Sequence, residues 1–322
     1  LIGEATADAE PDPADAYSGI DPEAPLVSRP GDLWEIGPHR LLCADALDGL
    51  AYARLLEGRK AELVFVDPPY NVSIDGHVSG LGRTRHAEFA MASGEMSEAE
   101  FTAFLGTALG HHAAHSAEGA LHFVCMDWRH AGDLLGAGRS IYSACKNLCV
   151  WVTTNAGMGS LYRSQHELVF VFKVGTAPHV NNVELGRHGR TRSNVWRYAG
   201  VNSFGVERDE ALALHPTVKP VRLVADAILD CSRRGARILD GFAGSGTTLL
   251  AAERTGRIGY GLEIEPRYVD AALRRLAEHA GLEAVHMESG RSFDDVARAR
   301  ALETSEADPR AEPHTKSGEA GS

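Results

Sequence analysis

The sequence contains few cysteines and no long hydrophobic run, and both features limit the classes of protein to which it can belong. Its 322 residues include five cysteines, without the paired spacing of a metal site or a disulfide framework. No stretch reaches the roughly 18 apolar residues of a membrane-spanning helix, and the first residues lack both the basic and the apolar region of a signal peptide. Hydrophobic residues make up 44% and charged residues 24% of the chain, as in globular proteins. We therefore predict a globular cytoplasmic protein, without a metal ion or a membrane partner.

Positive charge is scarce overall but is concentrated in one region. The net charge is −12, of which residues 1–30 contribute −6 and residues 291–322 contribute −2. Residues 139–197, in contrast, hold eight Lys or Arg and two Glu, a net charge of +6. A basic region within an acidic chain is typical of a nucleic-acid-binding surface. Charge alone is equally compatible with a solvated basic surface.

Composition divides the chain into a central domain and two tails. Residues 1–30 are rich in Ala, Asp, Glu and Pro, and residues 291–322 are similarly polar, so we predict a disordered acidic lead-in and a disordered tail. The domain then spans residues 31–290. Within it, residues 75–95 and about 175–214 are long, rich in Gly and His, and poorly periodic. Loops of this length are usually functional, and we expect a recognition loop and a target-recognition insertion there.

Between the tails, strand and helix patterns alternate. Strands are predicted at 39–44, 62–66, 121–125, 149–152, 168–172, 237–240 and 258–262. Helices are predicted after 45, from the capping box at 97–100, and at 247–254 and 266–280. This alternation predicts an α/β fold with a doubly wound, mostly parallel sheet, whose ligands lie at the carboxyl ends of the strands.

A glycine-rich turn follows the strand at 237–240. The sequence DGFAGSGTT at 240–248 joins a strand to a helix N-terminus, where backbone N–H groups approach a polar ligand. The residue after Gly246 is Thr247, whereas a phosphate-binding P-loop needs Lys. Glu263 ends the next strand, where a carboxylate can accept hydrogen bonds from ribose hydroxyls. The pattern predicts a nucleoside ligand without a long phosphate chain.

A second motif, Asp67-Pro68-Pro69-Tyr70, follows the strand at 62–66. The two prolines stiffen the backbone and remove two N–H donors. A carboxylate, a carbonyl and an aromatic face are thereby fixed together. Asp67 and the Pro68 carbonyl can accept hydrogen bonds from the amino group of a planar base on which Tyr70 stacks.

With these motifs the chain resembles the DNA amino-methyltransferases of the β group, which use S-adenosylmethionine. DPPY at 67–70 is similar to their catalytic motif, and DGFAGSGTT at 240–248 to their cofactor motif. Further similar segments are LYRSQHELVFVF at 161–172, SNVWRY at 193–198, HPTVKP at 215–220 and GLEIEPRY at 261–268. The resemblance covers about residues 31–280 and implies a Rossmann-like, seven-stranded methyltransferase fold, circularly permuted, with an inserted target-recognition region. One departure is Thr153 and Thr154, where a lysine is expected.

The resemblance assigns site residues position by position. The catalytic set is Asp67, Pro68, Pro69 and Tyr70. The methionine part of S-adenosylmethionine is expected near Asp240, Phe242, Gly244, Ser245, Gly246, Thr247 and Thr248. Glu263 is expected at the ribose, Asp45 near the adenine, and His215, Thr217 and Lys219 in a further cofactor-side segment. DNA contacts are expected from Arg163, Ser164, His166, Arg187, Arg190 and Arg192.

The predicted activity is methylation of the amino nitrogen of an adenine flipped out of double-stranded DNA. Cytosine N4 methylation remains the nearest alternative, although Asp67 favours adenine because cytosine enzymes more often have Ser at this position. Methylation at a cytosine ring carbon would need a Pro-Cys pair, which the sequence lacks, and protein-glutamine enzymes usually have Asn before the two prolines. A non-catalytic DNA-binding module is a more remote alternative. A cognate restriction endonuclease and a homodimer are further partners that the resemblance suggests.

Overall fold

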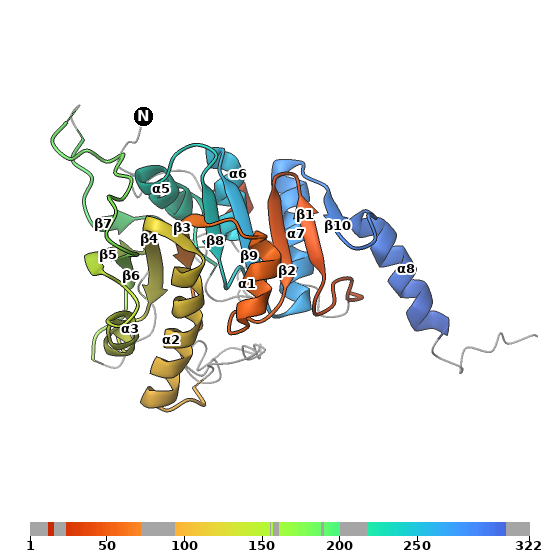
Figure 1. Ribbon diagram of the computed structural model, residues 1–322, viewed down its shortest axis with the longest axis horizontal. Coiled ribbons are helices and arrows are strands. Elements are labelled where there is room, and N and C mark those ends of the chain that lie inside the picture. The colour runs from red at the N-terminus through yellow and green to blue at the C-terminus, as the bar shows by residue number, and fades with distance from the viewer. Residues whose placement is uncertain are drawn as a thin grey trace, which may run out of the picture.

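The structure is a computed structural model that describes residues 12–15, 24–71, 94–154, 156, 161–187, 190–199 and 218–306. His215, Thr217, most of the predicted recognition loop at 75–95 and parts of the predicted insertion at 175–214 lie outside these residues. The described chain is an α/β fold with one sheet between helices (Figure 1). None of its helices is long and apolar enough to cross a membrane.

The described strands form one sheet in the order β10-β1-β2-β9-β8-β3-β4-β6-β5-β7. Their bounds are β1 Leu33–Ile36, β2 His39–Cys43, β3 Ala61–Val66, β4 Ser116–Met126, β5 Ala144–Val152, β6 His166–Lys173, β7 Val195–Arg197, β8 Arg237–Asp240, β9 Ile258–Glu263 and β10 Ala284–His286. The inner seven, from β2 to β5, are the seven-stranded sheet that the resemblance implies. The sequence-based prediction missed β1, β7 and β10, which are only three or four residues long.

Most strand pairs are parallel, and the chain order is permuted. Strands β2, β9, β8, β3 and β4 are mutually parallel, whereas β6 runs antiparallel to both β4 and β5. Strand β8, which leads into the glycine-rich turn, comes later in the chain than β3 but lies directly beside it. The carboxyl ends of β3, β8 and β9 therefore meet at one edge of the sheet, which brings the two sequence motifs together.

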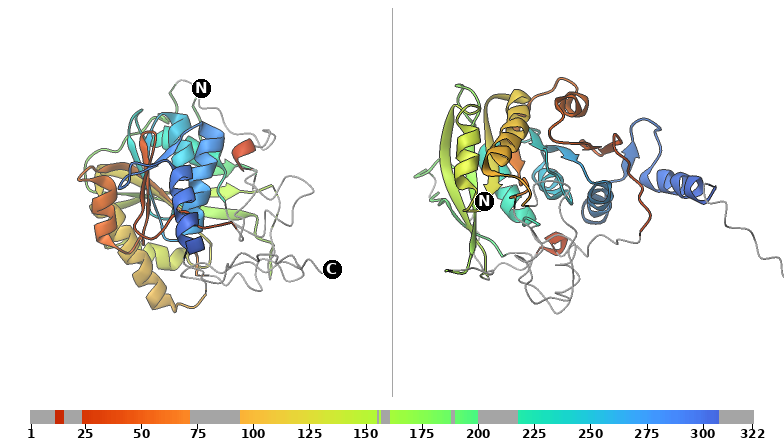
Figure 2. Two further views of the ribbon diagram at one scale, coloured as in Figure 1. Left: turned by 90° about the vertical axis from the view of Figure 1, so that its right-hand side faces the viewer. Right: turned by 90° about the horizontal axis from the view of Figure 1, so that it is seen from below.

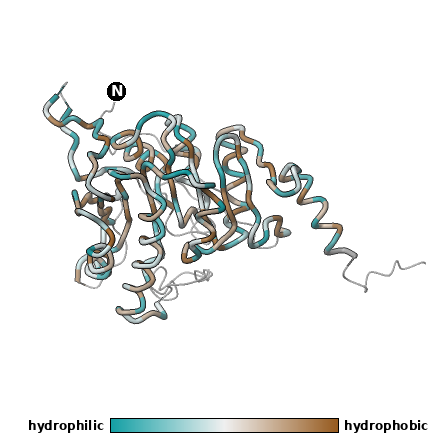
Figure 3. The backbone as a smooth tube through the Cα atoms, viewed as in Figure 1, coloured by the Kyte–Doolittle hydropathy of each residue, from teal (hydrophilic) through white to brown (hydrophobic). Residues whose placement is uncertain are grey.

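Helices cover both faces of the sheet (Figure 2). One face packs against α1 Gly49–Leu56, α2 Glu98–Ala114 and α3 Ala131–Gly138, and the other against α5 Val221–Cys231, α6 Thr247–Thr255 and α7 Pro266–Ala280. Strand β3 shows why the sheet needs helices on both faces. Leu63 and Phe65 join the core under α5–α7, whereas Val64 and Val66 join the core under α1–α3. Alternate side chains of a strand point to opposite faces, so a strand buried on both faces is continuously apolar. The hydrophobic stretches in Figure 3 accordingly follow the central strands.

Local sequence signals set several helix ends. Ser97 and Glu100 form the predicted capping box at the start of α2, and Pro266 occupies the first turn of α7. Helices α6 and α7 end at Gly256 and Gly281, both in the left-handed conformation that glycine adopts without steric cost.

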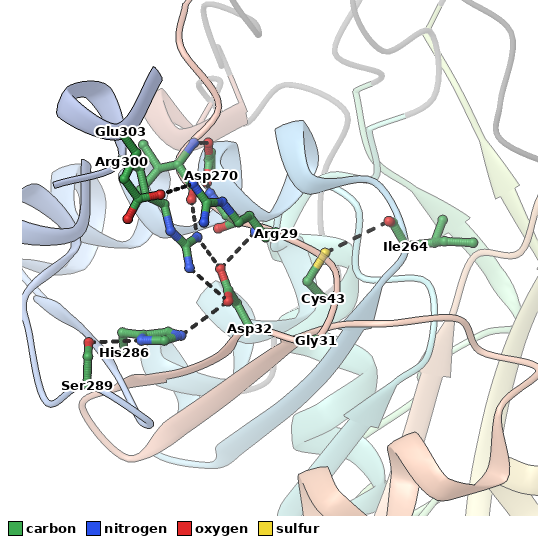
Figure 4. A network of polar contacts seen from close by, with 12 residues as sticks. Arg29, Gly31, Asp32, Cys43, Ile264, Asp270, His286, Ser289, Arg300 and Glu303 are labelled. Atoms are coloured by element: carbon green, nitrogen blue, oxygen red, sulfur yellow. Dashed lines mark hydrogen bonds and ion pairs between the residues drawn. The ribbon is translucent and has the colours of Figure 1, made fainter. Parts of the chain in front are cut away.

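Described parts of both predicted disordered tails are folded against the domain. Residues Phe293–Glu306 form helix α8, which extends away from the sheet (Figure 1). Asp32 anchors it, accepting hydrogen bonds from the Arg300 guanidinium, one of them at 3.0 Å (Figure 4). On the lead-in, the backbone N–H groups of Val27 and Ser28 each donate to Asp270 at 2.8 Å. Composition indicates polarity but does not show that buried carboxylates on distant elements bind these segments.

Candidate active site

A cavity lies at the carboxyl edge of the sheet, where β2, β3, β8 and β9 end. It has a volume of about 1100 Å³, counting its opening to solvent. Residues from both sequence motifs line it, among them Asp67, Tyr70, Asp240 and Glu263. A crevice outside the carboxyl ends of parallel strands is the general ligand site of open α/β sheets.

Asp240 ends β8 and begins the glycine-rich turn. One of its carboxylate oxygens accepts a hydrogen bond from the Thr248 hydroxyl at 2.6 Å, and the other accepts one from the Phe242 N–H at 2.9 Å. Burial raises the pKa of Asp240 to about 7, against the lowering effect of these hydrogen bonds. The turn therefore carries a carboxyl group that titrates near neutral pH.

Glu263 ends the neighbouring strand β9 and faces the same cavity. Its carboxylate accepts hydrogen bonds from the Gly244 N–H at 2.8 Å and the Glu265 N–H at 2.9 Å. Burial again dominates and raises the pKa of Glu263 to about 7. Asp45, after β2, also lines the cavity, and one of its carboxylate oxygens is engaged by the Leu47 N–H.

Three residues of the glycine-rich turn have structural partners in helix α7. Arg275, which is fully buried, donates hydrogen bonds to the Ser245 hydroxyl at 3.1 Å and the Thr247 hydroxyl at 2.8 Å. Gly246 has φ +81°, and a Cβ at this position would lie 2.9 Å from the Cβ of Ala272. The missing side chain of Gly246 leaves room for helix α7.

The Asp67-Pro68-Pro69-Tyr70 motif belongs to a partly buried network of four side chains. The Tyr70 hydroxyl lies 2.6 Å from Asp67 Oδ1 and 3.0 Å from Glu167 Oε2, so its one proton is shared by two carboxylates. The ammonium group of Lys219 lies 2.5 Å from Asp67 Oδ2 and 2.9 Å from Glu167 Oε2. The Lys219 side chain is only 4% exposed. Asp67 and Glu167 raise the pKa of the Lys219 amine although burial lowers it, so this lysine remains charged and binds both carboxylates.

Sequence reasoning assigned Lys219 to the cofactor side and did not identify Glu167. The structure places Lys219 on the wall of the cavity, with its amine at Asp67. Glu167 is the second residue of β6, within the segment 161–172 that carries the resemblance. It is one of only two acids in the basic region 139–197. This isolated acid is the one feature of the sequence that could have indicated a role for Glu167. It does not show that β6 lies beside β4, which in turn lies beside β3.

The sequence-based prediction also did not include Asn71, which directly follows the Asp67-Pro68-Pro69-Tyr70 motif. It has φ +52° and its side-chain oxygen accepts hydrogen bonds from the Gly94 and Met96 N–H groups, each at 3.1 Å. Asn71 thereby fixes the chain that enters α2 against the end of the catalytic motif.

The arginines predicted to bind DNA have different surroundings. Arg187 is 74% exposed and lies 3.7 Å from Glu184, and Arg190 lies 3.1 Å from the same carboxylate. Arg192 is only 12% exposed and pairs with Asp230 at 2.5 Å. Arg192 is thus part of the packing between the inserted segment and α5, and its surroundings do not suit a DNA contact.

The other predicted DNA contacts, Arg163, Ser164 and His166, lie where β6 begins. Because β6 is antiparallel to β4, with Leu168 opposite Met126, its start lies at the carboxyl edge that holds the catalytic motif. Arg163 and His166 are exposed there and Ser164 is half-buried. Their placement is compatible with a nucleic-acid surface beside the cavity.

Comparison with known proteins identifies the family and the fold. A sequence profile described as DNA methylase, N6_N4_Mtase, matches residues 61–274, about two thirds of the chain. The chain belongs to this DNA methylase family. It is 24% identical over 272 residues to the type II methyltransferase M.HpaI of Haemophilus parainfluenzae, covering 80% of each chain. It is also 36% identical to the DNA adenine methyltransferase YhdJ of Escherichia coli K12 over 124 residues, which cover 38% of this chain and 40% of YhdJ.

Solved structures confirm the methyltransferase fold. M1.HpyAVI in complex with S-adenosylmethionine superposes with a TM-score of 0.54 at 19% identity, covering 73% of this DNA methylase and 98% of that chain. The cytosine-N4-specific PvuII DNA methyltransferase gives 0.56 at 17% identity, covering 82% and 92%. The predicted Rossmann-like fold is confirmed, and S-adenosylmethionine is the cofactor that the family and the M1.HpyAVI complex support.

Proposed function

We propose that this DNA methylase transfers a methyl group from S-adenosylmethionine to the exocyclic amino nitrogen of an adenine in double-stranded DNA. The observation that carries the proposal is the position of Asp67. It stands at the head of a double-proline turn, at the edge of the cavity that also holds Asp240 and Glu263. Lys219 and Tyr70 fix its two carboxylate oxygens. The likeness to YhdJ, named a DNA adenine methyltransferase, supports the choice of base.

The residues in the cavity fit the proposed cofactor. Glu263 presents a buried carboxylate, the group that accepts hydrogen bonds from ribose hydroxyls. Phe242, Ile264 and Tyr268 supply apolar surface for an adenine ring. Asp67 and Asp240 make the remaining wall acidic, which suits the cationic sulfonium and amino groups of S-adenosylmethionine. When bound, the cofactor supplies an electrophilic methyl group, and the rest of the chemistry is positioning and electrostatics.

Asp67 and the Pro68 carbonyl would act on the target amine. The lone pair of an adenine amino group is delocalised into the ring, which makes the nitrogen a poor nucleophile. Hydrogen bonds from its two N–H groups to Asp67 and the Pro68 carbonyl draw it toward tetrahedral geometry and localise the lone pair. Because the amino group lies inside the base stack, the base must leave the duplex, at a cost of a few kcal/mol that contacts in the pocket offset. Lys219 fixes the Asp67 carboxylate in position for this role.

Cytosine N4 methylation is the alternative that a specific observation favours. The cytosine-N4-specific PvuII enzyme superposes on the chain as well as M1.HpyAVI does, and the proposed hydrogen bonds suit either amine.

The test is to express the chain in cells free of DNA methylation and to measure the modified nucleosides of their DNA by mass spectrometry. N6-methyladenine without N4-methylcytosine would confirm the proposal, and the reverse would establish the alternative. If neither modified base were detected, the result would favour a non-catalytic DNA-binding module.

The biological setting also remains a proposal. M.HpaI and M.HinfI are named type II methyltransferases, which supports a restriction-modification role with a cognate endonuclease. A homodimer and a cytoplasmic location remain predictions from the resemblance. Single-molecule sequencing of the same DNA would report the sequence context of methylation, which identifies the recognition site.

A further inference from the structure

One of the four tryptophans differs from the other three in its surroundings. Trp34, Trp151 and Trp196 are 5% exposed or less, whereas Trp128 is 54% exposed. Leaving half of an indole in water forgoes the hydrophobic stabilisation that the other three obtain. An exposed tryptophan beside an active site therefore indicates a surface that a ligand covers.

Trp128 lies at the catalytic edge of the sheet. Strands β3 and β4 are parallel neighbours, and Val66 pairs with Val124. Tyr70 and Trp128 each stand four residues beyond this pair, so both chains leave the sheet at its carboxyl edge. Neighbouring strands are separated by about 4.8 Å, so Trp128 follows the strand next to the one that carries the catalytic motif.

The indole of Trp128 is held by a cation. The Arg129 guanidinium carbon lies 5.0 Å from the ring centroid, and one of its nitrogens lies 3.3 Å from Asp127. Arg129 is itself 48% exposed. A guanidinium over one face of an indole limits its rotation, while the exposure of the ring leaves room for another planar group. The positive charge of Arg129 suits a polyanionic partner.

A second exposed aromatic lies at the same edge. Among the described residues, Trp128 and Tyr162 are the exposed aromatic side chains, and Tyr162 is 84% exposed. Tyr162 precedes β6, whose first residues lie beside the end of β4 because the two strands are antiparallel. Arg163 follows it and is also exposed. The exposed aromatics thus accompany arginines at the edge that holds Asp67.

We propose that Trp128 and Tyr162 are DNA-contact residues that stack on bases of the duplex next to the flipped nucleotide. This inference rests on the proposed DNA methyltransferase function but not on which base is methylated. Aromatic stacking on an unpaired or partly unstacked base contributes roughly 1–3 kcal/mol, and apolar side chains inserted at base steps stabilise distorted duplexes. Removing the target base from the stack exposes the faces of its neighbours, which are suitable partners for an indole held by arginine.

The unequal exposure of the tryptophans provides a direct test. Acrylamide, an uncharged quencher, should quench mainly Trp128 in the free enzyme, and Trp128→Phe should remove the accessible component. A duplex of about 30 base pairs, the length of a long bent DNA site, should carry the sequence found to be methylated. We expect saturation with this duplex to lower the wild-type quenching constant severalfold.

Affinity measurements should agree with the quenching. Trp128→Ala should weaken binding of the labelled duplex about 5- to 100-fold, measured by fluorescence anisotropy, while Trp128→Phe stays within a few-fold of wild type. Tyr162→Ala should weaken binding in the same direction. Leu302→Ala serves as a matched control because Leu302 is also exposed, at 65%, but lies on α8. It should leave duplex affinity unchanged, and S-adenosylmethionine affinity should be the same in all four variants.

Two outcomes would overturn the inference. If the duplex binds, as anisotropy shows, but leaves Trp128 fully accessible to acrylamide, the indole does not contact DNA. If Trp128→Ala and Tyr162→Ala bind the duplex as wild type does, stacking contributes nothing. Failure of the DNA methyltransferase function would look different, because nucleoside analysis would then show neither N6-methyladenine nor N4-methylcytosine, whatever the quenching result.

Discussion

The ammonium group of Lys219 lies 2.5 Å from Asp67 Oδ2, although 152 residues separate the two in the chain. The same ammonium group lies 2.9 Å from Glu167. One buried cation thereby holds two carboxylates, and the catalytic motif is joined to β6 and to the segment before α5. The orientation of Asp67 thus depends on two distant parts of the chain.

Asp67→Asn should abolish methyl transfer, lowering kcat by about 100-fold or more, because an amide is a weaker acceptor for the target amine. S-adenosylmethionine affinity, measured by calorimetry, should stay within a few-fold of wild type. Glu62→Gln is the control and should retain activity, because Glu62 is a partly exposed acid on β3, the strand that precedes Asp67. Near-normal turnover by Asp67→Asn would show that the proposed mechanism is wrong.

Lys219→Gln should both destabilise the fold and reduce turnover. Removing a buried cation leaves Asp67 and Glu167 as adjacent carboxylates, a loss of about 3–5 kcal/mol in the free energy of unfolding. Adding Glu167→Gln should recover about 1–3 kcal/mol of it, because it removes the excess negative charge. Urea unfolding of the two single variants and the double variant measures this coupling. Additive effects would mean that the two side chains act independently.

Cofactor affinity should depend on pH through Asp240 and Glu263. Burial raises the pKa of both carboxyls to about 7, so below pH 7 each is protonated in the free enzyme and must release its proton to accept hydrogen bonds from the ligand. Affinity should therefore fall as pH decreases below 7, by up to about tenfold per pH unit for each linked proton. Glu263→Gln should bind more weakly at pH 8 and show a shallower pH dependence. Calorimetry from pH 5.5 to 8.5 would refute the linkage if wild-type affinity were constant.

Gly246→Ala should lower the free energy of unfolding, and it should leave the cavity largely unchanged. A Cβ at Gly246 meets Ala272 of α7 at 2.9 Å, and φ of +81° is unfavourable for alanine. Together, crowding and backbone strain should cost about 2–4 kcal/mol, which thermal unfolding would measure. Gly58→Ala is the control, because its φ is +79° but no atom lies within 4 Å of the added Cβ. Equal effects of the two substitutions would assign the whole loss to backbone strain.

The arginines of the basic region should separate into two classes. Arg187→Gln should reduce the slope of log affinity for DNA against log salt concentration by about 0.9, the value for one phosphate contact. Arg192→Gln should instead lower the free energy of unfolding by about 3–5 kcal/mol, because it leaves the Asp230 carboxylate without its partner in a buried site. Binding of one duplex across a salt series, with urea unfolding of both variants, tests the distinction. A slope unchanged in Arg187→Gln would identify Arg187 as a solvated surface residue.

The sequence by itself determined the inner sheet and the location of the site. Continuous apolar strands, the capping box of Ser97 and the glycines that end α6 and α7 are local signals, and the predicted elements occur where these signals lie. The two motifs meet because the carboxyl ends of parallel strands share one edge, a consequence of strand direction alone. Fold, family and cofactor therefore followed from local patterns and their order.

Only the tertiary structure decided which distant residues serve the site and which support the fold. Lys219 reaches Asp67 because the segment before α5 passes over the end of β3, and Glu167 joins them because β6 lies antiparallel beside β4. The sequence does not distinguish Arg192 from Arg187, because both lie in the same basic segment. Packing buries Arg192 against Asp230 and leaves Arg187 in solvent. Burial and pairing are properties of non-local contacts, so no pattern along the chain could separate these roles.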